Sequence, residues 1–385
     1  MNQVTKTPVM LAPGPVQLHP EVQKILSLPM IHHRTPEFDA IFKRTLHNLK
    51  FLFQTKNDVY IQTSTGSGGM ESLLVNVLSP GDHVLSIISG KFGERWAEMA
   101  ETYGAKVHRI NCDWGTSVKI DDVKAALKEH PKIKIVLCQA CETSTATIHP
   151  IREIGKLIHQ TSALFLVDGI TATGAYPTPM DDWFIDGLVA GSQKAVMLPT
   201  GASFISFSQK AWAHVLTAKT PRFYFDIRKE QSANQKGESF FSAPVPLIRA
   251  LDFVLNDIEK IGLEKHFQNL HHRAEYTRKM APALGLKLFS SAPSDSVSAY
   301  LLPSGFEGAK LRDHLEKKYF LTVMGGQDQL KGKIIRLGHM GYISKENMHQ
   351  TSLRIAAGLN DFGLKLDLQT VDATSNSLLN SFDHF

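Results

Sequence analysis

Residues 163–194 read ALFLVDGITATGAYPTPMDDWFIDGLVAGSQK. The segment opens with a continuous apolar run, Ala163 to Val167, that ends at Asp168. Short apolar runs of this length are typical of strands that are buried on both faces of a sheet. A second apolar run, Leu188 to Ala190, precedes Lys194. The segment therefore predicts two buried strands with charged residues at or beyond their carboxyl ends, where open α/β sheets bind ligands.

Comparable apolar runs alternate with helical patterns on both sides of this segment. The other predicted strands are Val59 to Gln62, His83 to Ile88, Lys106 to Ile110, Ile133 to Ala140 and Ser203 to Phe207. From Pro36 to Thr55, and again from Met70 to Leu78, apolar residues recur at three- and four-residue steps, which indicates amphipathic helices. This alternation favours an α/β domain with a mostly parallel sheet covered on both faces.

The pattern changes after about residue 255 and predicts a second, smaller domain. Ile258 to Met280 form a charged helical stretch, and mixed strands and helices follow. We expect four parts, which are an N-terminal segment (1–20), a large domain (21–265), a smaller α+β C-terminal domain (266–365) and a polar tail (366–385). The tail lacks a clear apolar periodicity, so we treat it as an extension without assigned structure.

Length and composition limit the class of protein. The 385 residues allow two or three domains, and 43% hydrophobic with 21% charged residues excludes a disordered chain. The net charge of +5 includes no block of like charges, so nucleic acid is not expected as a partner. We expect no membrane span and no signal peptide, because the apolar runs are too short. With only three cysteines, a cytoplasmic location is expected.

Asp168 and Lys194 are the first candidates for chemistry. Each has an ordinary alternative, because Asp168 could cap a helix or a turn and most lysines are solvated surface charges. A lysine between two apolar runs is different: burial favours the neutral amine, which can attack an aldehyde to form a Schiff base. A carboxylate at the end of a buried strand can hold a cationic ring nitrogen of a cofactor and keep it protonated.

Thr65, Gly66 and Ser67 lie in the turn between a predicted strand and a predicted helix. Free N–H groups and the helix dipole at such a turn can bind a phosphate, and a capping turn is the alternative. Together with Asp168 and Lys194, the turn supplies an anion site, a partner for a ring nitrogen and an amine, the three contacts that pyridoxal phosphate requires. Candidates for further phosphate contacts and for a stacking surface are Ser192, Gln193 and Phe92.

Arg336 interrupts the apolar run from Ile334 to Leu337. A guanidinium in such a run needs a planar anionic partner, and a substrate carboxylate held by two parallel hydrogen bonds is one such partner. An internal salt bridge with a neighbouring acid explains the same pattern equally well. The residues alone leave both interpretations open.

The cysteine and histidine motifs of the sequence do not predict a metal site. Cys138 and Cys141 form a CxxC pair that ends a predicted strand and lacks a second pair for zinc, so two buried thiols are expected. The histidine pairs at 32–33 and 271–272 lack metal-ligand spacing with a third residue, and no GxSxG motif is present.

The order of motifs along the chain resembles the class V, fold-type I aminotransferases. Within these, it is similar to the alanine/serine–glyoxylate aminotransferase group, which includes proteins labelled as small subunits of soluble hydrogenase. The matching motifs are APGP (12–15), HRTPEF (33–38), SPGD (79–82), GKFGERW (90–96), ETST (142–145), VDG (167–169), GSQK (191–194), GGQD (325–328) and RLGHMG (336–341). The resemblance implies a pyridoxal-phosphate (PLP) enzyme that transfers an amino group between a small amino acid, such as alanine or serine, and glyoxylate or pyruvate.

The resemblance also implies roles for individual residues. Lys194 matches the Schiff-base lysine and proton carrier, and Asp168 matches the partner of the pyridinium nitrogen. Arg336 would hold the substrate carboxylate with help from the backbone of Gly14, and Thr143 would lie beside both cofactor and substrate. The implied cofactor-binding residues are Thr65, Gly66, Ser67, Phe92 as the stacking ring, Thr143, Asp168, Ile170, Gln193 and Lys194.

The family resembled is homodimeric, and a segment of the partner chain reaches the phosphate. In that segment this chain has Ser239 and Ser242 where threonines are usual, and serine keeps the hydroxyl. Ala146 stands where a glycine usually follows the ETST motif. Two alternative functions are a PLP lyase on the same fold and a non-catalytic, partner-binding subunit of a larger complex. A cysteine desulfurase is nearly excluded, because no cysteine follows Cys141.

Overall fold

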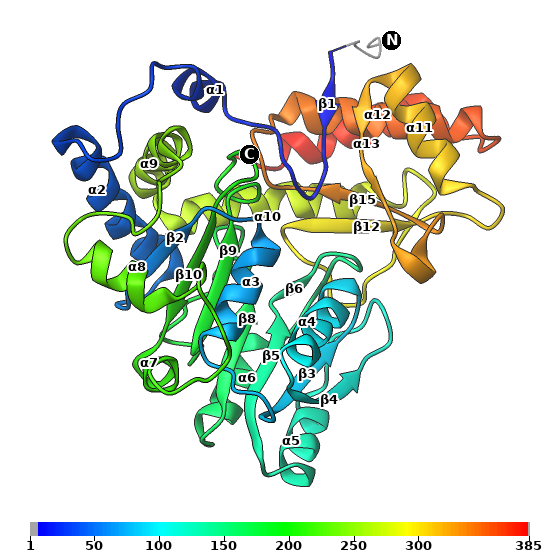
Figure 1. Ribbon diagram of the computed structural model, residues 1–385. Helices are drawn as coiled ribbons and strands as arrows, with labels where there is room; N and C mark the ends of the chain where they lie inside the picture. The colour runs from blue at the N-terminus through cyan, green and yellow to red at the C-terminus, as the bar shows by residue number, and fades with distance from the viewer. Residues whose placement is uncertain (1–6, 384–385) are drawn as a thin grey trace.

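The computed structural model describes residues 7–383, and the chain forms two main β-sheets, each packed against its own helices (Figure 1). The larger sheet consists of β2 (Val59–Gln62), β3 (His83–Ile88), β4 (Lys106–Asn111), β5 (Ile133–Gln139), β8 (Leu164–Asp168), β9 (Gly187–Gly191) and β10 (Ser203–Phe207). Their spatial order is β2-β10-β9-β8-β5-β3-β4. β10 runs antiparallel to both of its neighbours, and the remaining pairs are parallel. The predicted α/β fold with a mostly parallel sheet is confirmed.

Helices cover both faces of this sheet, which explains why its strands read as continuous apolar runs. In β8, Phe165 and Val167 pack into one core, and Leu164 and Leu166 pack into the other. The helices of the first core include α2 (Pro36–Phe53), α5 (Ile120–Glu129), α6 (Ile151–His159) and α9 (Val245–Ile261). Those of the second core are α3 (Gly66–Val75), α4 (Lys91–Thr102), α7 (Gln209–Val215) and α8 (Ile227–Asn234).

The smaller sheet is antiparallel and has the order β11-β12-β15-β14. Its strands are β11 (Lys287–Leu288), β12 (Val297–Leu301), β14 (Met324–Gly325) and β15 (Ile334–Gly338), and it is packed with α10 (Leu263–Met280), α11 (Gly308–Tyr319) and α12 (Lys345–Asp361). Near the start of the chain, β1 (Val9–Met10) pairs in parallel with β13 (Leu321–Thr322). These two strands form a separate two-stranded sheet, and the N-terminal segment meets the smaller sheet at Gly338 of β15, whose amide donates to the carbonyl of Leu11.

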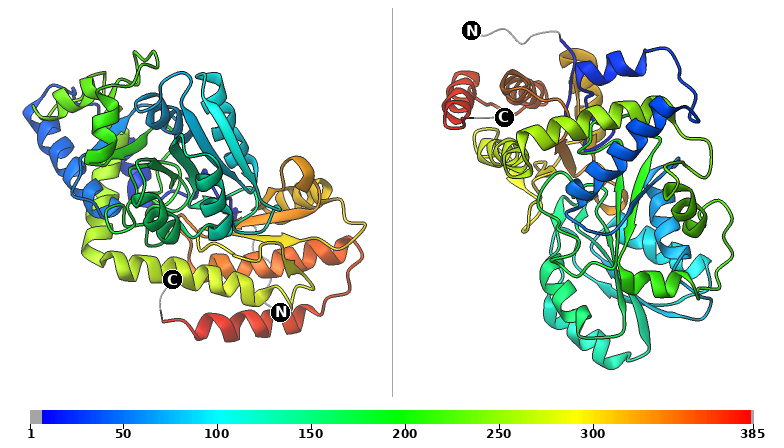
Figure 2. Two further views of the ribbon diagram at one scale, coloured as in Figure 1. Left: turned by 90° about the horizontal axis from the view of Figure 1, so that it is seen from below. Right: turned by 90° about the vertical axis from the view of Figure 1, so that its left-hand side faces the viewer.

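The tail that the sequence analysis left without structure contains helix α13 (Leu368–Asn380), which packs against α10 and α12 (Figures 1 and 2). Its buried face is formed by Val371, Ser375 and Leu379, which are spaced four residues apart. The hydroxyl of Ser375 lies 2.6 Å from the Tyr276 hydroxyl and 2.7 Å from Nδ1 of His349. Because a serine occupies the middle of the buried face, the apolar period of this helix is not visible in the sequence.

The predicted helical stretch from Ile258 to Met280 is helical apart from one residue, and it is divided between two helices. Gly262, with φ +83°, separates α9 from α10. This left-handed conformation suits glycine, which has no Cβ. The predicted boundary at residues 265/266 falls within α10, and the division of the chain into domains stays a prediction.

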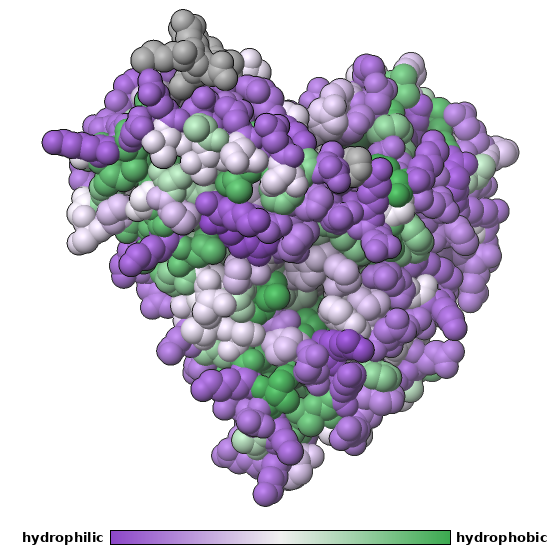
Figure 3. Space-filling model, turned by 180° about the vertical axis from the view of Figure 1, so that it is seen from behind, coloured by the Kyte–Doolittle hydropathy of each residue, from purple (hydrophilic) through white to green (hydrophobic). Residues whose placement is uncertain are grey.

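The remaining elements are α1 (Pro20–Leu26), the short pair β6 (Cys141–Glu142) and β7 (Thr147–Ile148), and a 3-10 turn at Asp328–Leu330. Hydrophilic residues cover most of the face shown in Figure 3, and hydrophobic residues lie between them in small groups. Within residues 7–383, every helix is too short or too polar to span a bilayer.

Candidate active site

A cavity of about 230 Å³ lies at the carboxyl ends of β8 and β9, against the first turn of α3. Residues from distant parts of the sequence meet there, as expected at the carboxyl edge of a parallel sheet. Of the candidates from the sequence analysis, it is lined by Thr65, Gly66, Ser67, Phe92, Thr143, Asp168, Ile170, Gln193 and Lys194. Its other lining residues, Met70, Arg95 and Thr171, were not predicted.

Lys194 lies in the turn between β9 and β10 and is buried, with 9% of its surface exposed. Its Nζ donates a 2.7 Å hydrogen bond to the carbonyl oxygen of Pro13. Burial, together with the positive charge of Arg336, lowers the pKa of Lys194 to about 8. An appreciable fraction of this amine is therefore uncharged in weakly alkaline solution, as a nucleophile requires.

The N-terminal segment passes directly over Lys194. A Cβ atom at Gly14 would lie 2.4 Å from Nζ of Lys194, and φ at Gly14 is +129°. Both observations favour glycine at this position. The segment is fixed to the smaller sheet, because the amide of Gly338 donates a 2.7 Å hydrogen bond to the carbonyl of Leu11. The structure thus places Gly14 beside Lys194, and the neighbouring Pro13 carbonyl was missed by the sequence analysis.

Asp168 is the last residue of β8 and has 4% of its surface exposed. Its Oδ1 accepts a 2.9 Å hydrogen bond from the amide of Ile170. Burial raises the pKa of Asp168 from 3.8 to about 7, while the positive charge of Lys194 opposes this shift. A cation bound in the cavity would therefore favour the ionised form of this carboxyl group.

The first turn of α3 borders the cavity, and its N-cap is Thr65, whose hydroxyl accepts from the amide of Gly68. The amides at the start of a helix have no partner within the helix and carry the positive end of its dipole. Nη1 of Arg95 donates a 3.0 Å hydrogen bond to the hydroxyl of Ser67. The Arg95 guanidinium also lies 4.9 Å from the centroid of the Phe92 ring. These groups form a site suited to an anion.

Arg95 could have been found from the sequence. It follows Phe92 by three residues in GKFGERW, and residues three apart lie on the same face of a helix. Apart from the ring of Phe92, no residue of this motif was assigned a role from the sequence.

Arg336 lies in β15, is buried with 7% of its surface exposed, and points toward the segment that carries Thr143. Its Nη1 donates to the carbonyl of Thr143 at 2.8 Å, and its Nε donates to the carbonyl of Gly325 at 3.0 Å. Within residues 7–383 it forms no salt bridge, so the interpretation as an internal ion pair is wrong. Burial lowers its pKa to about 10, which leaves the guanidinium charged at neutral pH. The hydroxyl of Thr143 lies 2.7 Å from that of Thr171.

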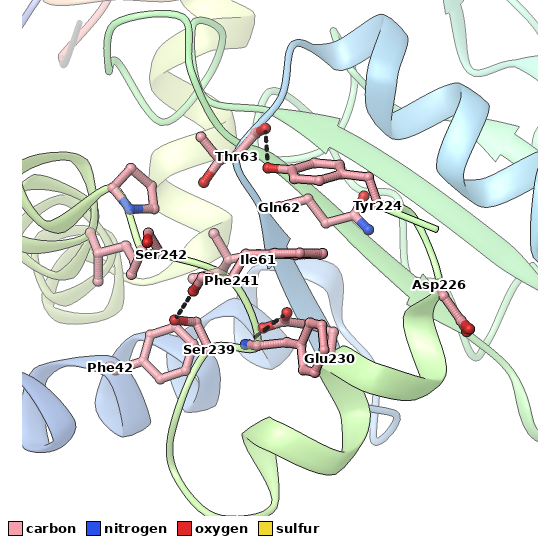
Figure 4. Close-up of a pocket in the computed structure, with 14 residues that line it drawn as sticks. Phe42, Ile61, Gln62, Thr63, Tyr224, Asp226, Glu230, Ser239, Phe241 and Ser242 are labelled. Carbon is pink, nitrogen blue, oxygen red and sulfur yellow. Dashed lines mark hydrogen bonds between the residues drawn. The ribbon is translucent and has the colours of Figure 1, made fainter. Parts of the chain in front are cut away.

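Ser239 and Ser242 lie apart from this cavity. They line a different hollow together with Thr63 and Tyr224 (Figure 4). The hydroxyl of Ser239 donates to the carbonyl of Phe241 at 2.7 Å, and Ser242 is exposed. Within one chain, the structure does not bring these two serines to the residues around Lys194.

The cysteines are free, and Cys138 and Cys141 are buried, as expected from the sequence. Burial raises the pKa of both thiols. In the part of the chain that the structure describes, no three His, Cys, Asp or Glu side chains are grouped so that they could hold a metal ion.

Comparison with known proteins identifies the family. The sequence profile described as Aminotransferase class-V matches residues 19–301, which is most of the chain. The chain belongs to the class-V aminotransferase family. The predicted family, and with it the predicted enzyme class, is confirmed.

Individual relatives agree with this assignment along nearly the whole chain. This class-V aminotransferase is 36% identical to the soluble hydrogenase, small subunit, of Synechococcus sp., over 92% of this chain and 94% of that protein. It is 34% identical to the L-aspartate–glyoxylate aminotransferase of Paracoccus denitrificans, over 92% of each chain. The solved ureidoglycine–glyoxylate aminotransferase of Bacillus subtilis has a TM-score of 0.92 at 29% identity, covering 99% of this chain and 100% of that one. The predicted fold type is confirmed.

The raised pKa of Asp168 predicts how its replacement changes stability with pH. Between about pH 4 and pH 7, the unfolded chain ionises Asp168 more readily than the folded aminotransferase does, so this residue destabilises the fold increasingly as the pH rises. Asp168→Asn removes that penalty. The free energy of unfolding of Asp168→Asn, relative to the wild type, should therefore be higher at pH 8 than at pH 5 in urea titrations of dialysed, ligand-free protein.

Asp182→Asn is the matched control, because Asp182 is exposed. Its stability relative to the wild type should stay nearly constant between the two pH values. A constant difference for Asp168→Asn as well would contradict the raised pKa.

Proposed function

We propose that this class-V aminotransferase is a PLP-dependent transaminase that moves an amino group between a small amino acid and a 2-oxo acid, glyoxylate or pyruvate. The observation that carries the proposal is a single cavity that brings together a buried lysine, a buried carboxyl group and the N-terminus of a helix. These are the groups that a phosphorylated pyridine aldehyde requires.

The residues around the cavity fit PLP group by group. The first turn of α3, the hydroxyls of Thr65 and Ser67, and the guanidinium of Arg95 suit its phosphate. Asp168 suits the ring nitrogen, and Phe92 offers an aromatic surface. Oε1 of Gln193 is buried without a hydrogen-bond partner in the described structure, which supports a polar occupant at this point.

The chemistry divides between the cofactor and the chain. When bound, PLP supplies an electron-withdrawing ring that stabilises the negative charge left when a proton leaves the substrate Cα. Asp168 keeps the ring nitrogen protonated by holding a negative charge against it. Lys194 takes up and returns the proton, and its lowered pKa suits both steps near neutral pH. The carbonyl of Pro13 orients its amine.

Arg336 is the proposed partner of the substrate carboxylate, with the backbone of Gly14 beside it. Its charge is buried and forms no salt bridge among residues 7–383, so an incoming carboxylate would supply a direct ionic partner. The names of the relatives from P. denitrificans and B. subtilis both include glyoxylate, which supports this oxo acid as an acceptor.

A homodimer with shared active sites is part of the proposal. Phe223 (74% exposed), Tyr224 (43%) and Phe240 (43%) lie around the segment of Ser239 and Ser242. Exposed apolar groups of this size mark surfaces that bind another protein. We propose that a second copy covers them and that the two serines reach its phosphate site. The cytoplasmic location stays a prediction, supported by three free cysteines.

Replacing Lys194 tests the assignment of the cofactor. The purified wild type should absorb in the visible, an added amino donor should bleach it, and borohydride should fix the cofactor on a peptide that contains Lys194. Lys194→Ala should lose turnover and covalent labelling, whereas exposed Lys219→Ala should keep both. A labelled peptide without Lys194 would refute the assignment, and a protein that never takes up the chromophore would favour the non-catalytic subunit.

Replacing Arg336 by lysine tests the carboxylate site, because lysine keeps the charge but lacks the planar fork. Loss of one charge-assisted hydrogen bond costs roughly 1.5–3 kcal/mol, so KM for both amino acid and oxo acid should rise at least about tenfold. Steady-state kinetics measure this. Arg312→Lys, on the neighbouring helix α11, is the control and should leave KM near the wild-type value. An unchanged KM in Arg336→Lys would rule out the proposed role.

Mixed dimers test the shared site. Subunits with Lys194→Ala are combined with subunits carrying Ser239→Ala and Ser242→Ala. If the serines act across the interface, one site of each mixed dimer keeps both Lys194 and the hydroxyls, and about half of the wild-type activity per dimer returns. If the serines act within their own chain, no site of the mixed dimer is complete. In that case the activity of the mixed dimer would not exceed that of the double-serine variant, and this result would contradict the proposal.

A further inference from the structure

Glu142 is a buried carboxylate for which the proposed reaction has no direct use. It ends β6 and has none of its surface exposed. Its oxygens accept hydrogen bonds from the amides of Phe92 at 3.1 Å, Gly93 at 3.0 Å and Ser144 at 3.1 Å. A fourth bond, of 2.5 Å, comes from the hydroxyl of Ser144. A buried charge with so many partners has a specific function or a strong structural role.

These contacts indicate that Glu142 is ionised. Burial raises its pKa, and the four hydrogen bonds oppose that shift. Every one of these partners is a donor, and a carboxylate accepting several N–H bonds is stabilised in its charged form. Glu142 also lies at the N-terminus of α4, where the helix dipole favours a negative charge.

Glu142 caps the N-terminus of helix α4, which has no side-chain cap of its own. The N-cap of α4 is Gly90, which has no side chain to accept hydrogen bonds. Instead, Glu142 accepts from Phe92 and Gly93, and the hydroxyl of Ser144 accepts from Lys91 at 3.0 Å. The fit is close, because a Cβ at Gly90 would lie 2.6 Å from Cγ of Glu142. The start of α4 therefore depends on a segment about 50 residues away in the sequence.

The same carboxylate adjoins two further walls of the site. Thr143 follows Glu142 directly and lines the cavity, and its carbonyl accepts from Arg336. The negative charge of Glu142 also favours the charged form of Arg336, which lacks a salt bridge within residues 7–383. Glu142 thus connects the aromatic wall at Phe92, the polar wall at Thr143 and the buried guanidinium.

We propose that Glu142 is a positioning residue. It fixes Phe92 against the cofactor ring and keeps Thr143 and Arg336 in place beside that ring. The proposal rests on PLP binding in this cavity. It gives Glu142 no contact with the reacting atoms. It acts on the cofactor through the backbone of Phe92 and on the substrate through the carbonyl of Thr143.

Glu142→Gln tests this role with little change in volume. Glutamine has one acceptor oxygen instead of two, and its NH₂ group would face N–H donors. The full-length chain is stripped of PLP and titrated with it, and the visible circular dichroism of the bound cofactor is recorded. The Kd for PLP should rise at least about tenfold, since hydrogen bonds to a charged group are lost. The dichroic signal per bound cofactor should fall, because the ring loses its fixed aromatic neighbour.

Two further variants make the result specific. Glu98→Gln makes the same chemical change on the exposed face of α4 and should match the wild type in both readouts. Ser144→Ala keeps the carboxylate but removes one donor and the acceptor for Lys91, so it should shift both readouts in the same direction by less. It also provides the test if Glu142→Gln does not fold.

The outcomes distinguish a failure of the proposed function from a failure of the positioning role alone. If the wild type itself binds no PLP, the proposed function fails. If the wild type binds PLP and the Glu142 and Ser144 variants bind it with wild-type Kd and dichroism, only the positioning role is overturned. A lower melting temperature with unchanged Kd and dichroism would likewise overturn it, because Glu142 would then be purely structural.

Discussion

The rest of the site depends on the attraction between two charges that are both removed from water, the ammonium of Lys194 and the carboxylate of Asp168. Burial disfavours each charge, and each charge stabilises the other. The fold imposes this proximity, because Asp168 ends β8 and Lys194 follows the adjacent parallel strand β9. The pKa of Lys194 therefore lies at about 8 and that of Asp168 at about 7, and a cation bound in the cavity would favour the ionised carboxylate.

Both sheets contribute to this one site. The larger sheet supplies Asp168, Lys194 and the helix termini around the proposed phosphate site. The smaller sheet supplies Arg336 from β15. The amide of Gly338, in the same strand, also anchors the N-terminal segment at Leu11, and the Pro13 carbonyl of that segment accepts from Lys194. From β15 of the smaller sheet, Arg336 donates a hydrogen bond to the carbonyl of Thr143, which lines the cavity at the larger sheet. The proposed cofactor and substrate sites thus meet where the two sheets adjoin, and Glu142 lies at that junction.

Sequence reasoning found those features whose cause is local. The buried strands of the larger sheet, such as Leu164–Asp168, are visible as apolar runs, and the start of α3 is visible as a turn between strand and helix. Features that depend on distant partners could not be found in this way. Helix α13 was missed because its buried face contains the polar residue Ser375. The hydroxyl of Ser375 forms hydrogen bonds with Tyr276 and His349, and these partners cannot be recognised from the sequence. The cap that Glu142 provides for α4 pairs segments about 50 residues apart, and no spacing rule predicts it.

The most direct test of the central claim is a crystal structure of the full-length chain grown with PLP. The account predicts one ring in the cavity, with Nζ of Lys194 covalently joined to the cofactor and a carboxylate oxygen of Asp168 about 2.7–3.2 Å from the ring nitrogen. A ring bound elsewhere, or a cofactor in this cavity whose nitrogen points away from Asp168, would contradict it.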